Sequence, residues 1–314
     1  GAQYRYPRSV WVIFSRATAV APLTLPSHAS IFTGLYPPRH GVRVNSGAKL
    51  QESETTLAEH LKAQGYQTAA SIGTQLLAGD SGFKQGFEIY AEPKRATRNA
   101  AFVVDDAIDA INRMQGRPFF LWVQFNDPHA PYAPPPGFRA AFENRLYDGE
   151  IAWMDAQLKR LIDHLRAQGL YDNTVVVATA DHGESLGEHG EETHGVFVYD
   201  STLKVPLIMR YPHRIVAGVR FTGLVSGVDL APTLLELMGL PPLPNVQGES
   251  CVARMAGGSA PERDAVYAES LFGERAFGWA PLHALRTADE KFIDAPDVEL
   301  YQLKRDPAET INLA

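Results

Sequence analysis

Short apolar runs alternate along this chain with segments whose apolar residues recur at helical spacing. The runs at 9–14, 119–125, 174–180 and 205–210 predict buried strands. Between the first two, residues 103–114 place Val103, Ala107 and Ile111 on one stripe and aspartates on the other, which predicts an amphipathic helix. Two further helices are predicted at 154–169 and 229–239, each ending at a glycine. This alternation predicts an α/β fold with a large, mostly parallel central sheet sandwiched by helices.

The patterning weakens toward the C-terminus. Proline and glycine become frequent from residue 240, and the tail after Cys251 shows no strong period. We therefore expect a main α/β domain over residues 1–250 and a small C-terminal subdomain over residues 251–314.

Composition excludes several classes of function. The net charge of −7 comes without a basic run, which argues against a nucleic-acid surface and against a membrane-binding patch. A single cysteine, Cys251, excludes an intramolecular disulfide framework and a site made of several thiolates. No apolar run approaches the roughly 18 residues of a spanning helix. The first residues do not resemble a signal peptide, and the compartment stays open: we expect a soluble protein, periplasmic or secreted if a leader was trimmed and otherwise cytoplasmic. Oligomeric state stays open.

Polar residues that follow the predicted strands suggest a site, because ligands of doubly wound sheets bind at the carboxyl ends of strands. Asp181 and His182 directly follow the strand at 174–180. A carboxylate beside an imidazole suits one divalent ion, Mn²⁺ or Zn²⁺ more readily than Ca²⁺ or Mg²⁺. The alternative is a capped turn without a metal.

Several histidines favour the same interpretation. His129 follows the strand at 119–125 in a proline-rich loop, and His189 and His194 lie in a glycine-rich segment after Asp181. Each alone could be a solvated surface residue. Histidine is scarce, however, with ten in 314 residues, and its concentration at strand ends and in these loops favours a functional site.

The stretch TLPSHASIFTG places Thr24 at the start of a predicted helix. A hydroxyl there lies in the positive field of the helix N-terminus, near backbone N–H donors, and a touching divalent ion would lower its pKa further. Thr24 could therefore act as a nucleophile toward phosphorus or sulfur. The alternative is that Thr24 or Ser27 is simply the N-cap, with Pro26 in the first turn.

These residues carry a resemblance. TLPSHASIFTGLYPPRHGV resembles the nucleophile motif of the sulfatase-like branch of the alkaline phosphatase superfamily. NDPHAPY, YDGEIAWMDAQL, VVVATADHGESLGEHG, YDSTLKVPLI, DLAPTLLELMGL and ELYQLKRDPAETINLA follow in family order. The resemblance covers nearly the whole chain. It implies a large central sheet, a smaller C-terminal sheet and a metal-dependent hydrolase of small anionic sulfate or phosphate esters.

The resemblance also implies roles for individual residues. Thr24 takes the position of the nucleophile and of a metal contact, and Asp181 and His182 take the metal-ligand pair. His129 takes the position of the acid that protonates the leaving oxygen. Four further residues take positions that contact the transferred group or the rest of the substrate: His28, Asn45, His194 and Thr74.

Two features depart from the family pattern at the nucleophile motif. Sulfatases convert a Cys or Ser at the nucleophile position into formylglycine, and threonine cannot yield that aldehyde. Direct attack by Thr24 resembles the phosphodiesterases and phospho-transferases of the superfamily instead, so we favour phosphoryl over sulfuryl transfer. His28 replaces an arginine of the family, which makes anion affinity pH-dependent near neutrality.

A further departure concerns the metal. The family follows its first strand with an acidic metal-binding loop, whereas here no acidic residue precedes Glu52. One hypothesis is that a segment is missing between Ile13 and Phe14. If the chain is continuous there, the metal site lacks a carboxylate. Three functions therefore stay open: a phosphate-ester hydrolase with Thr24 as nucleophile, a sulfatase that works without formylglycine, and a non-catalytic anion-binding protein.

Overall fold

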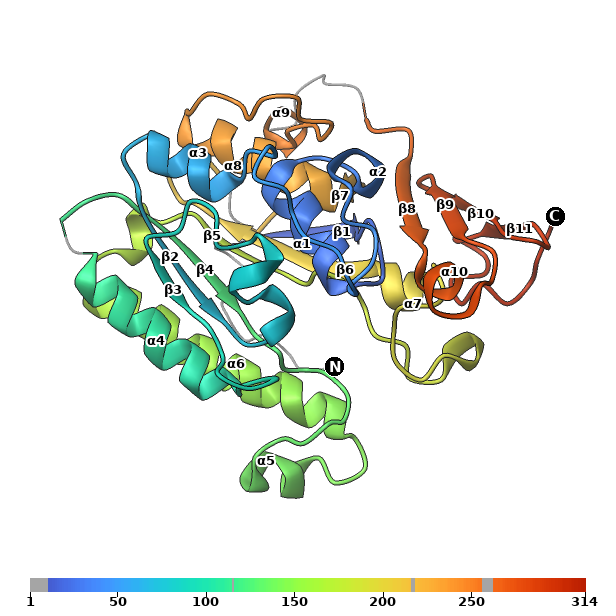
Figure 1. Cartoon of the computed structure of the whole chain (residues 1–314), viewed down its shortest axis with the longest axis horizontal. Helices are drawn as coiled ribbons and strands as arrows, with labels where there is room; N and C mark the ends of the chain where they lie inside the picture. The colour runs from blue at the N-terminus through green and yellow to red at the C-terminus, as the bar shows by residue number, and fades with distance from the viewer. Residues whose placement is uncertain (1–10, 115, 216–217, 256–261) are drawn as a thin grey trace. The chain divides into compact units, whose positions relative to one another are not determined.

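The computed structural model describes residues 11–114, 116–215, 218–255 and 262–314 (Figure 1). Within this part the chain forms two compact units. One comprises residues 56–174, and the other comprises residues 11–55 together with 175–314. The predicted α/β class, with helix-flanked sheet and a C-terminal sheet, is confirmed. The predicted boundary at residue 250 stays a prediction.

The unit of residues 56–174 is built on a three-stranded parallel sheet with strand order β3–β2–β4. Helix α4 packs on β2 and β4 and alongside α6, as Figure 1 shows. Its buried face carries Val103, Ala107 and Ile111, as the sequence predicts. The elements of this unit are α3 (Leu57–Ala63), β2 (Gln67–Ile72), η2 (Gln75–Leu77), η3 (Gly79–Ser81), β3 (Ile89–Ala91), α4 (Ala100–Arg113), β4 (Phe119–Gln124), α5 (Pro136–Ala141), α6 (Leu146–Ala167) and η4 (Tyr171–Asn173).

The second unit contains a four-stranded sheet with strand order β5–β6–β1–β7. Strand β6 runs antiparallel to both neighbours, whereas β1 and β7 are parallel, so this sheet is mixed. Its buried core includes Phe14 and Phe221, whose rings meet edge to face with centroids 5.3 Å apart. The elements around this sheet are β1 (Val12–Thr18), α1 (Thr24–Thr33), α2 (Pro37–His40), β5 (Val176–Thr179), η5 (Glu188–Gly190), α7 (Asp200–Leu203), β6 (Lys204–Arg210), β7 (Arg220–Ser226), η6 (Gly227–Asp229), α8 (Leu230–Met238) and α9 (Val252–Met255).

Strand β1 runs without interruption through the junction of Ile13 and Phe14. These residues pair with the consecutive residues Ile208 and Leu207 of β6. The chain as described is therefore continuous at this junction, and the hypothesis that the natural protein carries a further segment there stays a prediction. The first predicted strand also begins later than expected, at Val12, and continues to Thr18. Residues 9 and 10 of that prediction lie outside the described residues.

A second sheet in the same unit forms the C-terminal subdomain. It is an antiparallel meander with strand order β11–β10–β9–β8. Its elements are β8 (Val266–Ser270), α10 (Phe272–Phe277), β9 (Leu282–Arg286), β10 (Glu290–Asp294) and β11 (Glu299–Gln302).

A buried charge cluster ties this sheet to α7. Lys291 on β10 is fully buried, and its Nζ lies 2.6 Å from Asp200 Oδ1 and 2.7 Å from Glu309 Oε1. Glu309 also accepts a hydrogen bond from the backbone N–H of Asp200, and Arg286 pairs with the Asp200 carboxylate at 3.3 Å. Burial raises the pKa of Asp200, but Lys291 and Arg286 outweigh it and hold that pKa below its usual range. Asp200 is therefore ionised.

His40, at the end of α2, is buried in its neutral form. Val42 N–H donates to His40 Nδ1 at 3.1 Å, so Nε2 must carry the ring proton, and it faces Ser30 Oγ at 3.0 Å. Burial lowers the pKa of His40 to about 3, from an ordinary value of 6.5.

This burial predicts a pH-dependent loss of stability. The unfolded chain binds a proton at residue 40 below pH 6.5 and the folded chain does not, so folding stability falls as pH falls from about 6.5 toward 3. We expect the free energy of unfolding of the wild type to fall by about 1.4 kcal/mol per pH unit in this window relative to His40→Gln. Urea denaturation at pH 7, 6 and 5 measures the difference. Parallel pH profiles for the two proteins would contradict it.

Candidate active site

Helix α1 begins at Thr24, which is buried. The N-cap is Leu23, whose extended backbone enters the helix without a side-chain cap. Neither Thr24 nor Ser27 is therefore the N-cap, and the capping alternative is wrong for both. Ser27 instead donates from Oγ to the carbonyl of Ala21 at 2.8 Å. Because Thr24 caps nothing, its hydroxyl has no structural role in starting this helix.

The first turn of α1 is less open than the sequence suggests. Asn45 Oδ1 accepts a hydrogen bond from Leu25 N–H at 2.9 Å, and Pro26 has no N–H. The prediction that the backbone N–H groups at the start of this helix are free to bind an anion is therefore wrong for Leu25 and Pro26. The carbonyl end of Asn45 caps the helix from a loop twenty residues away, so its amide nitrogen is the end suited to donate to an oxyanion.

Asp181 lies beside this helix. It follows β5, as predicted, and its Oδ2 lies 3.4 Å from Nδ1 of His28 and 3.5 Å from Nε2 of His182. The same His28 nitrogen lies 2.9 Å from the backbone carbonyl of Thr24, one helical turn earlier. Burial raises the pKa of Asp181, but the charges of His182 and His28 outweigh it, so this pKa lies below its usual value. An ionised carboxylate thus faces the first turn of α1.

His182 is oriented toward Asp181 by a backbone contact. Its Nδ1 lies 2.8 Å from Gly183 O, and because a carbonyl only accepts, Nδ1 carries the proton and Nε2 faces Asp181 as a lone-pair donor. This is the arrangement in which proteins hold a metal-ligating histidine. Burial, opposed by Asp181, lowers the pKa of His182. The pair fits two ligands of one ion, but among the described residues no three His, Cys, Asp or Glu side chains are grouped to hold a metal.

His194 packs against His182, with ring centroids 4.1 Å apart and the ring planes tilted by 32°. Its Nδ1 lies 3.1 Å from Oε1 of Glu184, whose side chain is almost fully buried. Glu184 fixes the orientation of this imidazole, and the sequence analysis missed it. Its signal was its place in DHGE, two residues after His182. Glu191, also missed, accepts from the N–H groups of Val196 and Phe197 and closes the loop that carries His194.

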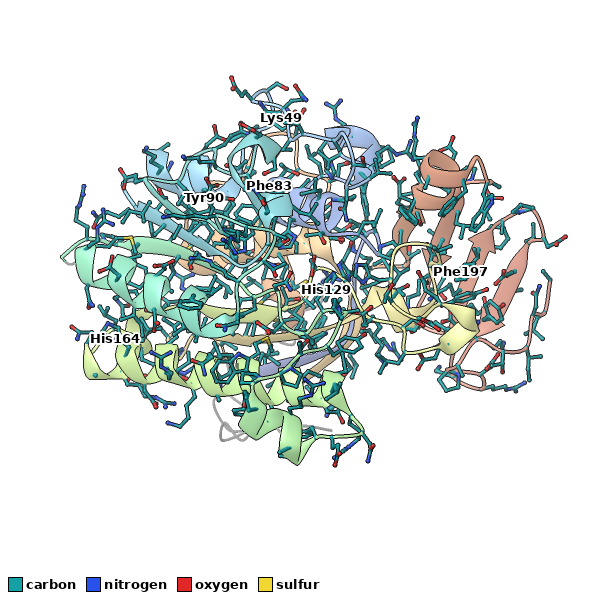
Figure 2. The ribbon with its side chains drawn as sticks, turned by 60° about the horizontal axis from the view of Figure 1, so that its bottom comes forward. Lys49, Phe83, Tyr90, His129, His164 and Phe197 are labelled. Carbon is teal, nitrogen blue, oxygen red and sulfur yellow. The ribbon has the colours of Figure 1, made fainter. Side chains whose placement is uncertain are left out.

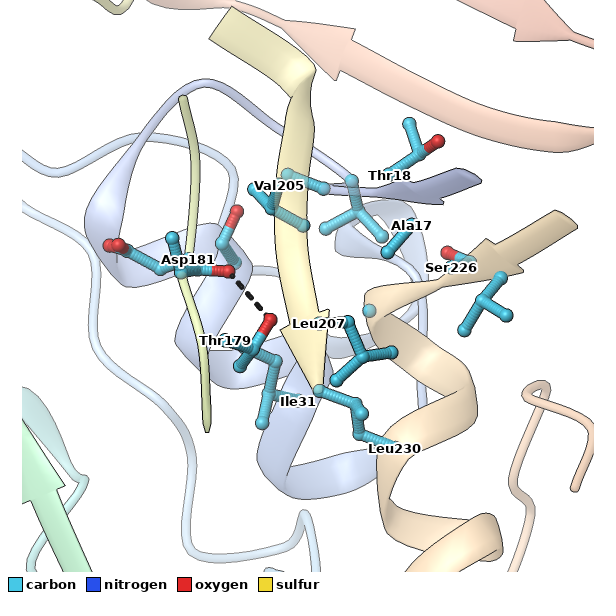
Figure 3. A pocket seen from close by; sticks show the side chains of 15 residues that line it. Ala17, Thr18, Ile31, Thr179, Asp181, Val205, Leu207, Ser226 and Leu230 are labelled. Atoms are coloured by element: carbon cyan, nitrogen blue, oxygen red, sulfur yellow. Dashed lines mark hydrogen bonds between the residues drawn. The ribbon is translucent and has the colours of Figure 1, made fainter. Parts of the chain in front are cut away.

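A cavity of about 10 Å³ lies beneath α1 (Figure 3). Figure 3 shows Ile31, Val205, Leu207 and Leu230 around it, with Asp181 among the lining residues. A volume of this size holds about one water molecule. It is too small for a substrate.

Thr74 and His129 belong to the unit of residues 56–174. Thr74 precedes η2, and its Oγ1 accepts from Leu76 N–H, which gives it a local capping role. Its predicted contact with substrate stays a prediction. Figure 2 labels His129 in its loop, well apart from His164 of α6.

The loop of His129 is held by Glu150 of α6, which the sequence analysis also missed. Glu150 accepts from His129 N–H at 2.9 Å and from Ala133 N–H at 2.6 Å. His129 Nδ1 lies 2.6 Å from the carbonyl of Ala130, so Nδ1 carries a proton. Nε2 is therefore the ring nitrogen through which His129 would exchange a proton with a substrate.

Glu150 also shapes the titration of Asp127. Burial and the charge of Glu150 raise the pKa of Asp127 to about 6. In Glu150→Gln the repulsion is removed and burial remains, so we expect this pKa to fall but to stay above 3.8. Carboxyl NMR titration of the two proteins measures the change. An unchanged pKa of Asp127 would show that Glu150 does not act on it.

Comparisons with known proteins show which family the sequence matches and which solved structures share the fold. A family model described as Sulfatase matches residues 10–240, and one described as N-sulphoglucosamine sulphohydrolase, C-terminal, matches residues 187–314. An N-acetylglucosamine-6-O-sulfatase of Bacteroides thetaiotaomicron is 33% identical over 176 residues, which cover 54% of this chain and 31% of that protein. A choline-sulfatase of Rhizobium meliloti is 25% identical over 385 aligned positions, which cover 94% of this chain and 73% of that protein.

Two points follow from these alignments. The chain spans only part of the length of several curated relatives. It covers 31% of the N-acetylglucosamine-6-O-sulfatase and 53% of an arylsulfatase of Clostridium perfringens. The 385 positions aligned with the choline-sulfatase exceed the 314 residues of this chain, so that relative carries internal segments that the chain lacks.

Solved structures share the fold. A phosphonate monoester hydrolase of Agrobacterium radiobacter superposes with a TM-score of 0.85 at 22% identity, covering 98% of this chain and 85% of that one. A structure solved with its substrate D-glucosamine-2-N,6-O-disulfate superposes with a TM-score of 0.85 at 21% identity, covering 98% and 86%. No helix among the described residues is long and apolar enough to cross a membrane.

Proposed function

The chain belongs to the sulfatase family, and from this premise we propose that it hydrolyses small anionic esters with the Thr24 hydroxyl as nucleophile. One observation carries the proposal. A single nitrogen of His28 lies within 3.4 Å of both the Thr24 backbone carbonyl and the Asp181 carboxylate. The first turn of α1 and Asp181, which follows β5, are thus neighbours, and we assign them to one site.

In this mechanism the Thr24 hydroxyl gives up its proton to water, its oxygen bonds to phosphorus or sulfur, and the bond to the leaving oxygen breaks as that oxygen takes up a proton. Water then cleaves the bond between the Thr24 oxygen and phosphorus or sulfur, which restores the hydroxyl and releases inorganic phosphate or sulfate. His28, His194 and the amide of Asn45 stabilise the negative charge that builds up on the oxygens of the transferred group. Glu184 keeps His194 in orientation. Protonation of the leaving oxygen by His129 stays a prediction from the family resemblance.

Members of the sulfatase family generally use a divalent metal ion, and we propose that Asp181, His182 and the Thr24 oxygen would hold one here. A bound cation of this kind lowers the pKa of an attached hydroxyl group and so makes it a better nucleophile. The nitrogen of His182 in the donor set favours Mn²⁺ or Zn²⁺ over Ca²⁺, although Ca²⁺ is the usual ion of the family. Elemental analysis of the purified protein tests the choice of ion.

The favoured substrate is a phosphate ester, because threonine cannot form formylglycine. The structural likeness to a phosphonate monoester hydrolase is consistent with this choice. The second candidate is a sulfate ester, which the family match and the sulfatases among the relatives favour.

A panel of p-nitrophenyl phosphate, phosphodiester, phosphonate and sulfate distinguishes the candidates. The proposal expects kcat/KM for the phosphorus esters to exceed that for the sulfate. The reverse order would establish the sulfatase without formylglycine. Binding of inorganic phosphate or sulfate without turnover of any ester, in the presence of added divalent metal, would establish the non-catalytic anion-binding protein and overturn the proposal.

A further inference from the structure

Two consecutive residues at the end of β8, Glu269 and Ser270, are buried although both are polar. Glu269 is 1% exposed and Ser270 is 2% exposed. Buried polar groups need hydrogen-bond partners, and here the partners include segments outside the C-terminal sheet. The backbone N–H of Glu269 donates to Val20 O at 2.9 Å, in the segment that precedes α1. The end of β8 therefore contacts the chain that leads into the candidate site.

The Glu269 carboxylate binds Arg43, in the loop that follows α2. Arg43 donates to it from Nε and from Nη2, each at 2.7 Å, and Tyr267 Oη donates at 2.6 Å. A bidentate pair of this kind fixes the direction of the guanidinium as well as its position. Arg43 lies two residues before Asn45, whose Oδ1 accepts from Leu25 N–H in the first turn of α1. The ion pair therefore limits where the Asn45 amide can lie.

Ser270 holds the loop that carries His194. Its Oγ donates at 2.6 Å to the carbonyl of Gly195, the residue that follows His194. A Cβ atom placed on Gly195 would lie 3.3 Å from the side chain of Leu23, the N-cap of α1. The bond from Ser270 thus fixes the backbone at the point where the loop of His194 packs against the start of this helix.

We propose that Glu269 and Ser270 are positioning residues of the site. Glu269 acts through Arg43 on Asn45. Ser270 acts on His194 through the backbone that joins it to the next residue. This inference rests on the proposed function, in which the Asn45 amide and the His194 ring stabilise charge on the oxygens of the transferred group. Such donors lose most of their effect when they are misplaced by about 1 Å, so a buried bond one or two residues away controls their contribution.

Double-mutant cycles in activity test the proposal. Arg43→Met should lower kcat/KM about tenfold, mainly through kcat, and Glu269→Gln should act in the same direction. In an Asn45→Ala background either change should cost less than about twofold, because the group that they position is gone. Ser270→Ala should lose its effect in the same way in a His194→Ala background, but keep it in Asn45→Ala. A change that acts only on folding would cost the same factor in every background.

Arg263→Met is the matched control. Arg263 is also a buried arginine of this unit, but it donates to Asp229 and to Tyr36 Oη. We expect it to lower the midpoint of urea denaturation while kcat/KM stays within about twofold of the wild type. Arg43→Lys keeps the charge without the bidentate geometry, so it should recover only part of the activity that Arg43→Met loses.

Amide hydrogen exchange tests the same contact without turnover. Leu25 N–H, which donates to Asn45 Oδ1, should exchange at least about tenfold faster in Arg43→Met than in the wild type. Gly34 N–H, which donates to Ser30 O at the other end of α1, should exchange at an unchanged rate.

Equal factors for Arg43→Met with and without Asn45, or for Ser270→Ala with and without His194, would overturn the proposal. If the wild type hydrolyses no ester, the proposed function fails, and exchange then decides the positioning by itself. Faster exchange of Leu25 N–H in Arg43→Met would support it, and an unchanged rate would refute it.

Discussion

Replacing Thr24 with alanine is expected to lower kcat/KM for the best ester substrate by about 10³-fold or more, the range seen when a covalent nucleophile is removed. The helix itself should survive, because Leu23 is the N-cap and Asn45 satisfies Leu25 N–H. The loss should therefore appear in activity and not in the free energy of unfolding. Steady-state kinetics and urea denaturation of the same preparations measure the two quantities.

Two control variants sharpen this experiment. Thr24→Ser keeps a hydroxyl group and should retain much of the activity. Ser27→Ala removes a hydroxyl group one turn along the same helix that only donates to Ala21 O, so it should cost stability of about 1 kcal/mol with little change in kcat. A phosphoryl or sulfuryl group found on residue 24 by mass spectrometry after acid quenching would support covalent catalysis. Retained turnover in Thr24→Ala would remove this residue from the mechanism.

Replacing Lys291 with methionine is expected to lower the free energy of unfolding by about 3–5 kcal/mol, the cost of leaving a buried charge without its partner. Lys291 is fully buried and lies within 2.7 Å of two carboxylates, on Asp200 and Glu309. In the variant Arg286 remains as a cation for Asp200, whereas Glu309 loses its ammonium partner. Urea denaturation at pH 7 measures the change.

Lys304 provides the matched control for this prediction. It forms an ion pair of 2.8 Å with Asp289, but its side chain is 67% exposed. Lys304→Met should therefore change stability by no more than about 0.5 kcal/mol. Adding Glu309→Gln to Lys291→Met should recover part of the loss, because the neutral amide needs no counter-charge. Equal effects of Lys291→Met and Lys304→Met would contradict a special role for the buried cluster.

Local sequence patterns predicted correctly those features of helices that depend on residues close by in the sequence. The stripe of α4 and the glycine at the end of α8 depend on neighbours within a few positions, and both agree with the structure. Asp181 and His182 were predicted as site residues because they follow an apolar strand, and the Asp181 carboxylate lies 3.4 Å from His28 of α1. The direction of β6 was not predictable in this way, because strand pairing depends on partners far along the chain.

Two of the errors of sequence-based prediction share one physical cause. The N-cap interpretation of Thr24 and Ser27 treated the helix start as local, whereas the oxygen that accepts from Leu25 N–H comes from Asn45. Glu150, one acidic residue in a polar helix, gave no sign that it is buried and binds a loop about twenty residues earlier. Such contacts are decided by tertiary packing, which neither periodicity nor residue spacing encodes.

The two hydrogen bonds of Glu150 have a practical consequence for protein engineering. The loop from His129 to Ala133 takes its shape from a side chain of α6 and not from its own residues alone. A transplant of residues 127–133 into another scaffold would have to supply that carboxylate at an equivalent helix position, and directed libraries of loop sequences should keep residue 150 as glutamate.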